Sequence, residues 1–197
     1  MSLSVFETLA SLLEYPLEGW PLRLTGAKRE LLTANPQLFP ALLDFSRSVD
    51  HLSVAQIQEQ YTQTFDLNPV CTLDVGYHLF GENYKRGVFL ANLRETEEPF
   101  SLGQEHQLPD YLPVLLRLLT RLEDEELRIS LIAECLVPAV EKMLEALSPS
   151  GNPYGHLIRA INTALKTEVP ESYSRIPSPP MRDAASIPGL YQIQSRG

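Results

Sequence analysis

Leucine dominates the apolar residues of this chain. Its 197 residues include 34 leucines, but valine and isoleucine together number only 18. A β-branched side chain loses χ1 freedom in a helix, whereas leucine loses little, so this imbalance favours helices. A chain of this length also buries roughly 70% of its unfolded surface, so it needs no disulfide or metal to fold. The composition argues against a β-sandwich or barrel and predicts a helical core.

Apolar residues recur at helical spacing through most of the chain. In segment 4–14, one helical face carries Val5, Phe6, Leu9, Leu12 and Leu13. The same reasoning predicts helices over about 22–34, 42–45, 53–66, 75–81, 82–98, 110–122, 124–147 and 153–166. No segment reads as a convincing strand. We therefore expect an all-α fold, a single compact bundle of about seven to nine helices.

Several of these helices have recognisable ends. Ser53 and Gln56 form a capping-box pattern before the helix at 54. Asp110 stands where a cap is expected, and Pro113 follows in the first turn, where a missing N–H costs little. Pro138 lies inside the helix at 124–147 and should kink it.

The composition of the chain and its hydrophobic pattern change after Glu168. Residues 170–197 contain five prolines and several serines and show no helical period. We expect a helical domain over residues 1–168 and an extended, Pro-rich tail over 169–197.

Charge and cysteine content exclude several classes of protein. The chain carries 16 Lys and Arg against 25 Asp and Glu, a formal charge of −9, which argues against binding a nucleic acid backbone. Residues 1–16 have no basic residue and no secretory pattern, and no apolar run approaches the ~18 residues of a membrane span. Cys71 and Cys135 form no disulfide framework and no CxxC pair. The sequence predicts a cytoplasmic protein without membrane insertion.

No pattern in the sequence indicates catalysis or a bound metal or cofactor. The four histidines share no helical spacing, and no phosphate loop, GxSxG or GxGxxG motif is present. Cys71 and His78 are the nearest thiol–imidazole pair, and a small buried thiol with a polar histidine near a turn is the better explanation of them. We expect no catalytic residue, no metal and no cofactor.

Segment 74–86 is the densest unusual stretch, since it mixes aromatic side chains, both charge signs and two glycines between helices. Such a mixture is typical of a recognition surface, although its aromatic residues could equally be core. Residues 82–126 hold ten acidic residues against five basic ones. These acids are either ordinary solvated helix ends or a negative rim that attracts a basic or amphipathic peptide.

Two motifs resemble the NarJ family of nitrate reductase delta subunits, within the TorD/DmsD class of molybdoenzyme chaperones. The first runs from Tyr61-Thr-Gln-Thr-Phe65-Asp66 to His78-Leu-Phe-Gly81-Glu82-Asn-Tyr-Lys-Arg86-Gly87. The second is Leu108-Pro109-Asp110-Tyr111-Leu112-Pro113, with Tyr111 where the family usually has His. A weaker match is Asn152-Pro153-Tyr154. The resemblance spans about residues 4–166.

The resemblance implies a cytosolic, non-enzymatic chaperone in nitrate assimilation. Such a protein binds the amino-terminal segment of an apo-molybdoenzyme catalytic subunit while molybdenum cofactor and an iron–sulfur cluster are inserted. Cofactor delivery proteins are further candidate partners.

The expected peptide-binding residues are drawn from segment 74–86 and from the second motif. They are Asp74, Tyr77, His78, Phe80, Glu82, Tyr84, Arg86, Asp110, Tyr111 and Pro113. Two alternatives remain. One is a small-molecule enzyme that uses His78, Glu82 and Asp110 in one cleft, and the other is a structural subunit of an oxidoreductase complex.

Overall fold

The computed structural model describes residues 4–67, 71–103, 106–148 and 151–173, and most of these residues are helical. The elements are α1 (Ser4–Leu12), α2 (Trp20–Ala34), α3 (Phe39–Val49), α4 (Val54–Phe65), α5 (Val75–Phe80), α6 (Tyr84–Glu97), α7 (Leu112–Leu119), α8 (Glu125–Ser130), the π-helix η1 (Leu131–Leu136), α9 (Val137–Leu147) and α10 (Tyr154–Glu168). Because α8, η1 and α9 follow one another without a break, they make one rod, and the described residues contain nine continuous helices. The predicted all-α bundle is confirmed.

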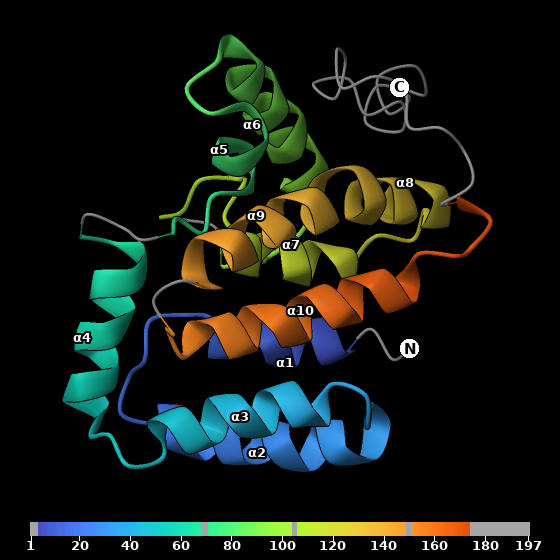
Figure 1. Ribbon diagram of the computed structural model, residues 1–197. Coiled ribbons are helices and arrows are strands. Elements are labelled where there is room, and N and C mark those ends of the chain that lie inside the picture. The colour runs from blue at the N-terminus through green and yellow to red at the C-terminus, as the bar shows by residue number, and fades with distance from the viewer. Residues whose placement is uncertain (1–3, 68–70, 104–105, 149–150, 174–197) are drawn as a thin grey trace.

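Helices α1 and α10 lie at the centre of the bundle (Figure 1). α1 packs against α7, α2 and α10, while α10 packs against α3, α9 and η1. Both faces of the central layer are apolar, as the buried Phe6, Leu9, Leu157 and Ile161 illustrate. The leucine-rich helix α7 is buried almost throughout, with Arg117 as its one charged residue.

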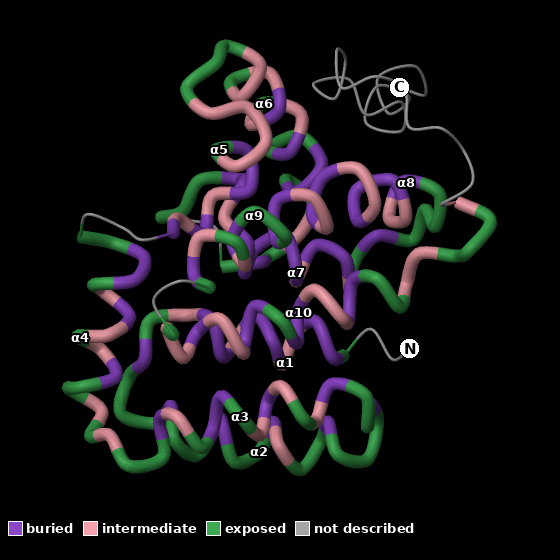
Figure 2. The backbone as a smooth tube through the Cα atoms, in the orientation of Figure 1, coloured by how far each residue is buried: buried purple, intermediate pink, exposed green. Residues whose placement is uncertain are grey.

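The outer helices bury only one side. In Figure 2 the tube of α2 and α3 alternates between buried positions that face the bundle and exposed positions that face outward. Helices α5 and α6 project from one end of the bundle, and α4 lies along its side, apart from the packed layers (Figure 1). The side position of α4 makes it one wall of the cleft described below.

The helix predicted over 124–147 is present, but it widens before Pro138. Residues Leu131–Leu136 form π-helical turns, and Pro138 then lies in the first turn of α9. A proline ring inside a helix clashes with the carbonyl four residues earlier, here that of Glu134. The wider π-helical turns change the position of the carbonyls before Pro138. The irregularity predicted at Pro138 therefore lies in the turns that precede it.

Some predicted helix ends are confirmed and others are wrong. Ser53 and Gln56 form the predicted capping box, and Pro113 lies in the first turn of α7. Asp110 does not cap α7, whose N-cap is Tyr111, because the Asp110 carboxylate is turned toward α5 and α6. The helix predicted from Glu82 begins at Tyr84 instead.

Helix α10 ends at Glu168. Residues 174–197, most of the predicted tail, lie outside the described part of the chain. Within the described part, the Tyr173 hydroxyl donates a hydrogen bond to the Glu134 carboxylate, which ties the segment after α10 to η1. None of the described helices is long and apolar enough to cross a membrane.

Candidate functional site

A buried carboxylate, that of Asp110, joins the two sequence motifs. Asp110 is fully buried, and its Oδ2 accepts hydrogen bonds from Arg86 Nε and from the Gly76 backbone N–H, each at 3.0 Å. Arg86 also pairs with Asp74, with 3.3 Å between Nη2 and Oδ2. Burial raises the pKa of Asp110, while the hydrogen bonds from Arg86 and Gly76 oppose that rise. We call Asp74, Arg86 and Asp110 the Asp110 cluster.

The backbone beside this cluster is held by a short antiparallel bridge between Asp74 and Tyr111. The Val75 N–H donates to the Asp110 carbonyl at 2.8 Å, and the Leu112 N–H donates to the Leu73 carbonyl at 2.9 Å. The bridge brings two segments that are distant in sequence to one place, and it holds Asp74 and Tyr111 side by side.

A cleft of about 710 Å³ opens in front of this bridge. Five stretches of chain form its walls: the α1–α2 connection, α2, the end of α4, the residues before α5, and the segment from Gly103 into α7. The lining residues are Glu14, Tyr15, Leu17, Arg23, Tyr61, Phe65, Asp66, Thr72, Leu73, Asp74, Gly103, Gln107, Tyr111, Val114 and Arg117. The cleft is therefore formed by segments that are distant in the sequence.

Aromatic side chains from α4 and the α1–α2 connection form one wall of the cleft. The Tyr61 and Tyr111 hydroxyls hydrogen-bond at 3.0 Å. The Tyr61 ring packs edge-on against Tyr15 and Phe65, with centroids 5.5 and 5.0 Å apart. Tyr15 and Leu17 are 44% and 61% exposed, so apolar surface is available at the mouth of the cleft.

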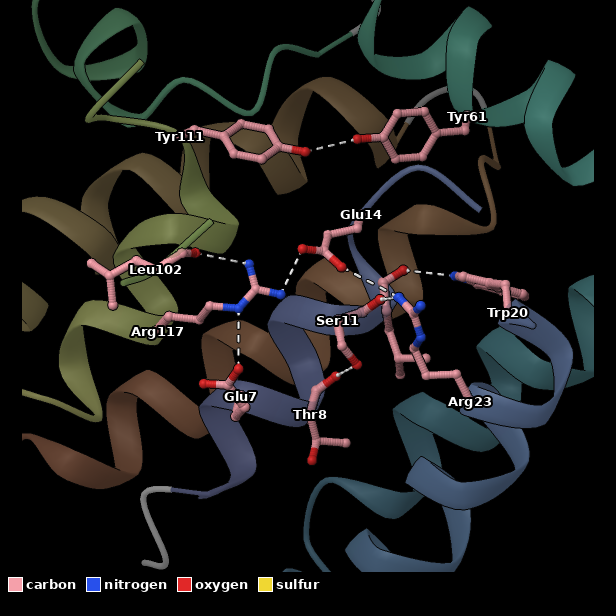
Figure 3. A network of polar contacts seen from close by, with 11 residues as sticks. Glu7, Thr8, Ser11, Glu14, Trp20, Arg23, Tyr61, Leu102, Tyr111 and Arg117 are labelled. Atoms are coloured by element: carbon pink, nitrogen blue, oxygen red, sulfur yellow. Dashed lines mark hydrogen bonds and ion pairs between the residues drawn. The ribbon is translucent and has the colours of Figure 1, made fainter. Parts of the chain in front are cut away.

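Another wall carries a chain of ion pairs (Figure 3). Arg117 donates to Glu7 at 3.1 Å, to Glu14 at 2.6 Å and to the Leu102 carbonyl at 3.2 Å. Arg23 also pairs with Glu14, at 3.3 Å. Two arginines and two glutamates balance one another, so this wall is polar but carries no net charge.

The predicted binding residues divide into those at the cleft and those away from it. Asp74 and Tyr111 line the cleft, and Arg86 and Asp110 hold the bridge behind it. Tyr77 is 45% exposed and lies under the Arg86 guanidinium, 5.9 Å from the ring centroid. Tyr77, Arg86 and Asp110 do not line the cleft.

The other five predicted residues take different positions. His78 hydrogen-bonds to the Thr72 carbonyl, and Phe80 packs on Phe89. Tyr84 is 78% exposed at the start of α6, and Pro113 is buried in α7. Glu82 is exposed before α6 begins, so the possible helical pair with Arg86 does not form, and Arg86 pairs with Asp74 and Asp110 instead.

The geometry does not bring the alternative catalytic trio together. Asp110 is engaged by Arg86, the His78 Nε2–H donates to the Thr72 carbonyl at 2.8 Å, and Glu82 is exposed. None of the described cavities is lined by any of the three. The shared pocket that an acid–base mechanism requires is therefore not formed by these residues.

Cys71 and His78 approach each other, but they do not form a reactive or metal-binding pair. Cys71 Sγ lies 3.9 Å from His78 Nε2, and burial raises the pKa of the thiol to about 12. A thiol with such a pKa is protonated at neutral pH and is a poor nucleophile and ligand. No group of three or more His, Cys, Asp or Glu among the described residues is placed to hold a metal ion.

The acids between residues 82 and 126 do not form the rim of this cleft. Its carboxylates belong to Glu14, Asp66 and Asp74. Of the expected rim, Asp124 caps α8 by accepting the Leu127 N–H, and Glu97 is buried at the end of α6. Of the two readings of the acids in 82–126, the described residues therefore give no support to a negative rim at this cleft.

Sequence reasoning missed most of the cleft, although two signals were present. Tyr61, Phe65 and Asp66 belong to the first motif, but they were not chosen as binding residues. Arg117 interrupts an otherwise apolar helix, and a lone charge in such a position needs partners. Nothing in the sequence indicated that Glu14 would pair with Arg117, or that Arg23 would pair with Glu14.

Comparison with known proteins identifies the family. No family model matches the chain. A protein of Bacillus subtilis strain 168, "Probable nitrate reductase molybdenum cofactor assembly chaperone NarJ", is 31% identical over 163 residues, which cover 82% of this chain and 88% of that protein. The chain belongs to the NarJ family.

Two further relatives agree with this placement. An Escherichia coli K12 protein, "Probable nitrate reductase molybdenum cofactor assembly chaperone NarW", is 26% identical over 66% of this NarJ-family chain and 55% of its own length. The "Nitrate reductase-like protein NarX" of Mycobacterium tuberculosis H37Rv is 28% identical over 80% of the chain but only 24% of its own length. The NarJ-like sequence thus also occurs within a much longer polypeptide.

Proposed function

We propose that this protein is an assembly chaperone for a nitrate reductase-type molybdoenzyme. It binds the amino-terminal segment of the apo catalytic subunit and holds that subunit while the molybdenum cofactor and the iron–sulfur cluster are inserted. It acts in the cytoplasm and catalyses no reaction itself. Proteins that deliver the cofactor are its further partners.

The observation that carries this proposal is the cleft in front of the Asp74–Tyr111 bridge. Residues of both motifs line it, and the relatives are named as assembly chaperones. Exposed apolar side chains beside polar anchors are what an amphipathic peptide requires, because its apolar face needs a groove and its polar face needs hydrogen-bonding partners.

The positions of two cleft residues, Asp74 and Tyr111, are fixed by the surrounding structure. Asp74 and Tyr111 are set by the backbone bridge, and the Asp110 cluster supports that bridge from behind. Because Asp110 and Arg86 are occupied with each other, we assign them to positioning. Asp74 and Tyr111 would contact the client.

Peptide titration tests the proposal directly. A fluorescently labelled peptide from the amino terminus of the catalytic subunit encoded beside this chain is titrated with the full-length protein. We expect saturable binding, and we expect co-purification with the apo catalytic subunit but not with the mature enzyme. Absence of saturable binding contradicts the proposal.

Two leucines provide a matched pair of variants for the same assay. Leu17 lines the cleft and Leu22 does not, and both are exposed, at 61% and 80%. Leu17→Ser should weaken binding severalfold because apolar contact area is lost. Leu22→Ser should leave the affinity unchanged. If both substitutions change the affinity equally, the peptide does not bind in this cleft.

A further inference from the structure

The charged residues of the cleft are paired, with one exception. Glu14 is held by Arg117 and Arg23, and Asp74 is held by Arg86. The Asp66 carboxylate lines the same cleft, and it makes no hydrogen bond or ion pair with the described residues. Asp66 therefore supplies an uncompensated negative charge at the end of α4.

Aromatic side chains of the cleft share one wall with this carboxylate. Tyr15, Tyr61 and Phe65 line the cleft together with Asp66, and the Tyr61 ring contacts both of the other rings. Tyr61 and Tyr111 line the cleft with Asp66, and burial raises the pKa of both hydroxyls, with the negative charge of Asp66 as a smaller contribution. A free carboxylate beside aromatic rings is a suitable environment for an organic cation.

The position of Asp66 is unfavourable for the helix itself. Asp66 is the C-cap residue of α4, and the last turn of that helix contains no basic residue. A negative charge at a helix carboxyl end is repelled by the helix dipole. Asp66 is exposed, and partial burial of its carboxyl raises the pKa, with no cationic partner to oppose that rise. A residue that costs the fold stability is a candidate for a functional role.

We propose that Asp66, with Tyr15, Tyr61 and Phe65, forms a subsite for one arginine or lysine side chain of the client segment. The inference rests on the proposed function, since it names what the cleft selects in its peptide. Asp66 is a specificity residue here, because the paired acids Glu14 and Asp74 already have cationic partners within the chain. Tyr15, the exposed ring of the three, contacts the apolar stem of the client side chain, with the buried Tyr61 and Phe65 rings behind it, and the carboxylate binds its charged end.

The test is a double-mutant cycle between the protein and the peptide. Asp66→Asn is compared with Glu59→Gln, which removes one acidic charge from the same helix at a residue that does not line the cleft. The probe is the amino-terminal peptide of the neighbouring catalytic subunit, together with versions in which each Arg or Lys is replaced singly by Gln.

We expect Asp66→Asn to weaken binding of the parent peptide about fivefold, the size of one partly exposed ion pair, and to reduce its salt dependence. One Gln-substituted peptide should bind wild-type protein equally weakly and should be insensitive to Asp66→Asn. Glu59→Gln should bind every peptide as wild type does. The melting temperature of Asp66→Asn should be unchanged or raised, because the repulsion at the end of α4 is removed.

The possible results distinguish failure of the Asp66 subsite from failure of the chaperone proposal. If the parent peptide binds but Asp66→Asn weakens all the peptides equally, or none of them, the subsite is wrong and the chaperone proposal stands. If a client peptide without any Arg or Lys binds tightly, the subsite is likewise wrong and the chaperone proposal stands. If wild-type protein binds no peptide, both proposals fall.

Discussion

The hydroxyls of Tyr61 and Tyr111 lie 3.0 Å apart and join the end of α4 to the segment that leads into α7. This hydrogen bond (Figure 3) is one of several links that hold α4, besides the contacts of the Tyr61 and Phe65 rings with Tyr154 of α10. Two others are the bond from Gln58 Nε2 to the Pro16 carbonyl at 2.8 Å and the bond from Asn152 Nδ2 to Thr64 Oγ1 at 2.7 Å.

Removal of one hydroxyl should destabilise the protein measurably. Tyr111→Phe keeps the ring but leaves the Tyr61 hydroxyl without its partner, and we expect the free energy of unfolding to fall by about 1 kcal/mol. The double variant Tyr61→Phe/Tyr111→Phe should lose less free energy of unfolding than the two single variants lose together. Chemical denaturation of the four proteins measures this coupling. Strict additivity would show that the pair contributes nothing.

Gly76 has no room for a side chain. A Cβ atom at this position would lie 2.7 Å from Asp110 Oδ2 and 3.1 Å from a Phe89 ring carbon. Gly76→Ala should therefore cost about 1–3 kcal/mol of stability through overpacking.

Gly87 provides the control, because a Cβ there would meet nothing within 4 Å. Gly87→Ala should stabilise α6 by up to about 1 kcal/mol, since alanine favours a helix. The two changes should have opposite signs in the same denaturation assay, and equal effects would contradict the close packing at Gly76.

The imidazole of His78 should make stability fall in mild acid. Burial lowers the pKa of His78, although the hydrogen bond to the Thr72 carbonyl opposes that change. The unfolded chain then takes up a proton near the ordinary pKa of about 6.5, while the folded protein takes it up only at lower pH. This contribution to stability is complete above that value and is lost as the pH falls from it through the lower pKa of the folded protein.

Denaturation across this pH range, with NMR titration of the imidazole, checks the prediction. His78→Gln should remove part of the slope below pH ~6.5, because the titrating group is absent. An unchanged slope in that variant would assign the pH dependence to other groups.

The stable domain should end at Tyr173 and not at Glu168. Residues after Tyr173 lack a periodic apolar face, so a chain truncated there should unfold cooperatively at the same denaturant concentration. Truncation after Val169 also removes the hydrogen bond from Tyr173 to Glu134, and should cost about 1 kcal/mol. Tyr173→Phe in the full chain should reproduce that loss. Loss of cooperative unfolding in the chain truncated after Tyr173 would instead place the tail within the folded domain.

The helical fold and many of its boundaries could be predicted because they depend on local features. Helical spacing of leucines, the capping box at Ser53 and the proline in the first turn of α7 act within a few residues. Asp110 shows where local reasoning fails. Its position before a helix predicted a cap, but the carboxylate binds Arg86 and the Gly76 N–H, and this arrangement exists only once α5, α6 and α7 have packed.

The sequence alone therefore determined the fold class, the family motifs and the change of composition after Glu168. Tertiary packing decided which motif residues share a cleft. Asp74 and Tyr111 meet through a backbone bridge, and Tyr61 reaches Tyr111 across 50 positions. Helical periodicity identifies the buried face of each helix, but it does not specify which other helix that face will contact. The wall with Glu14, Arg23 and Arg117, and the unpaired Asp66 near it, emerge only from that packing.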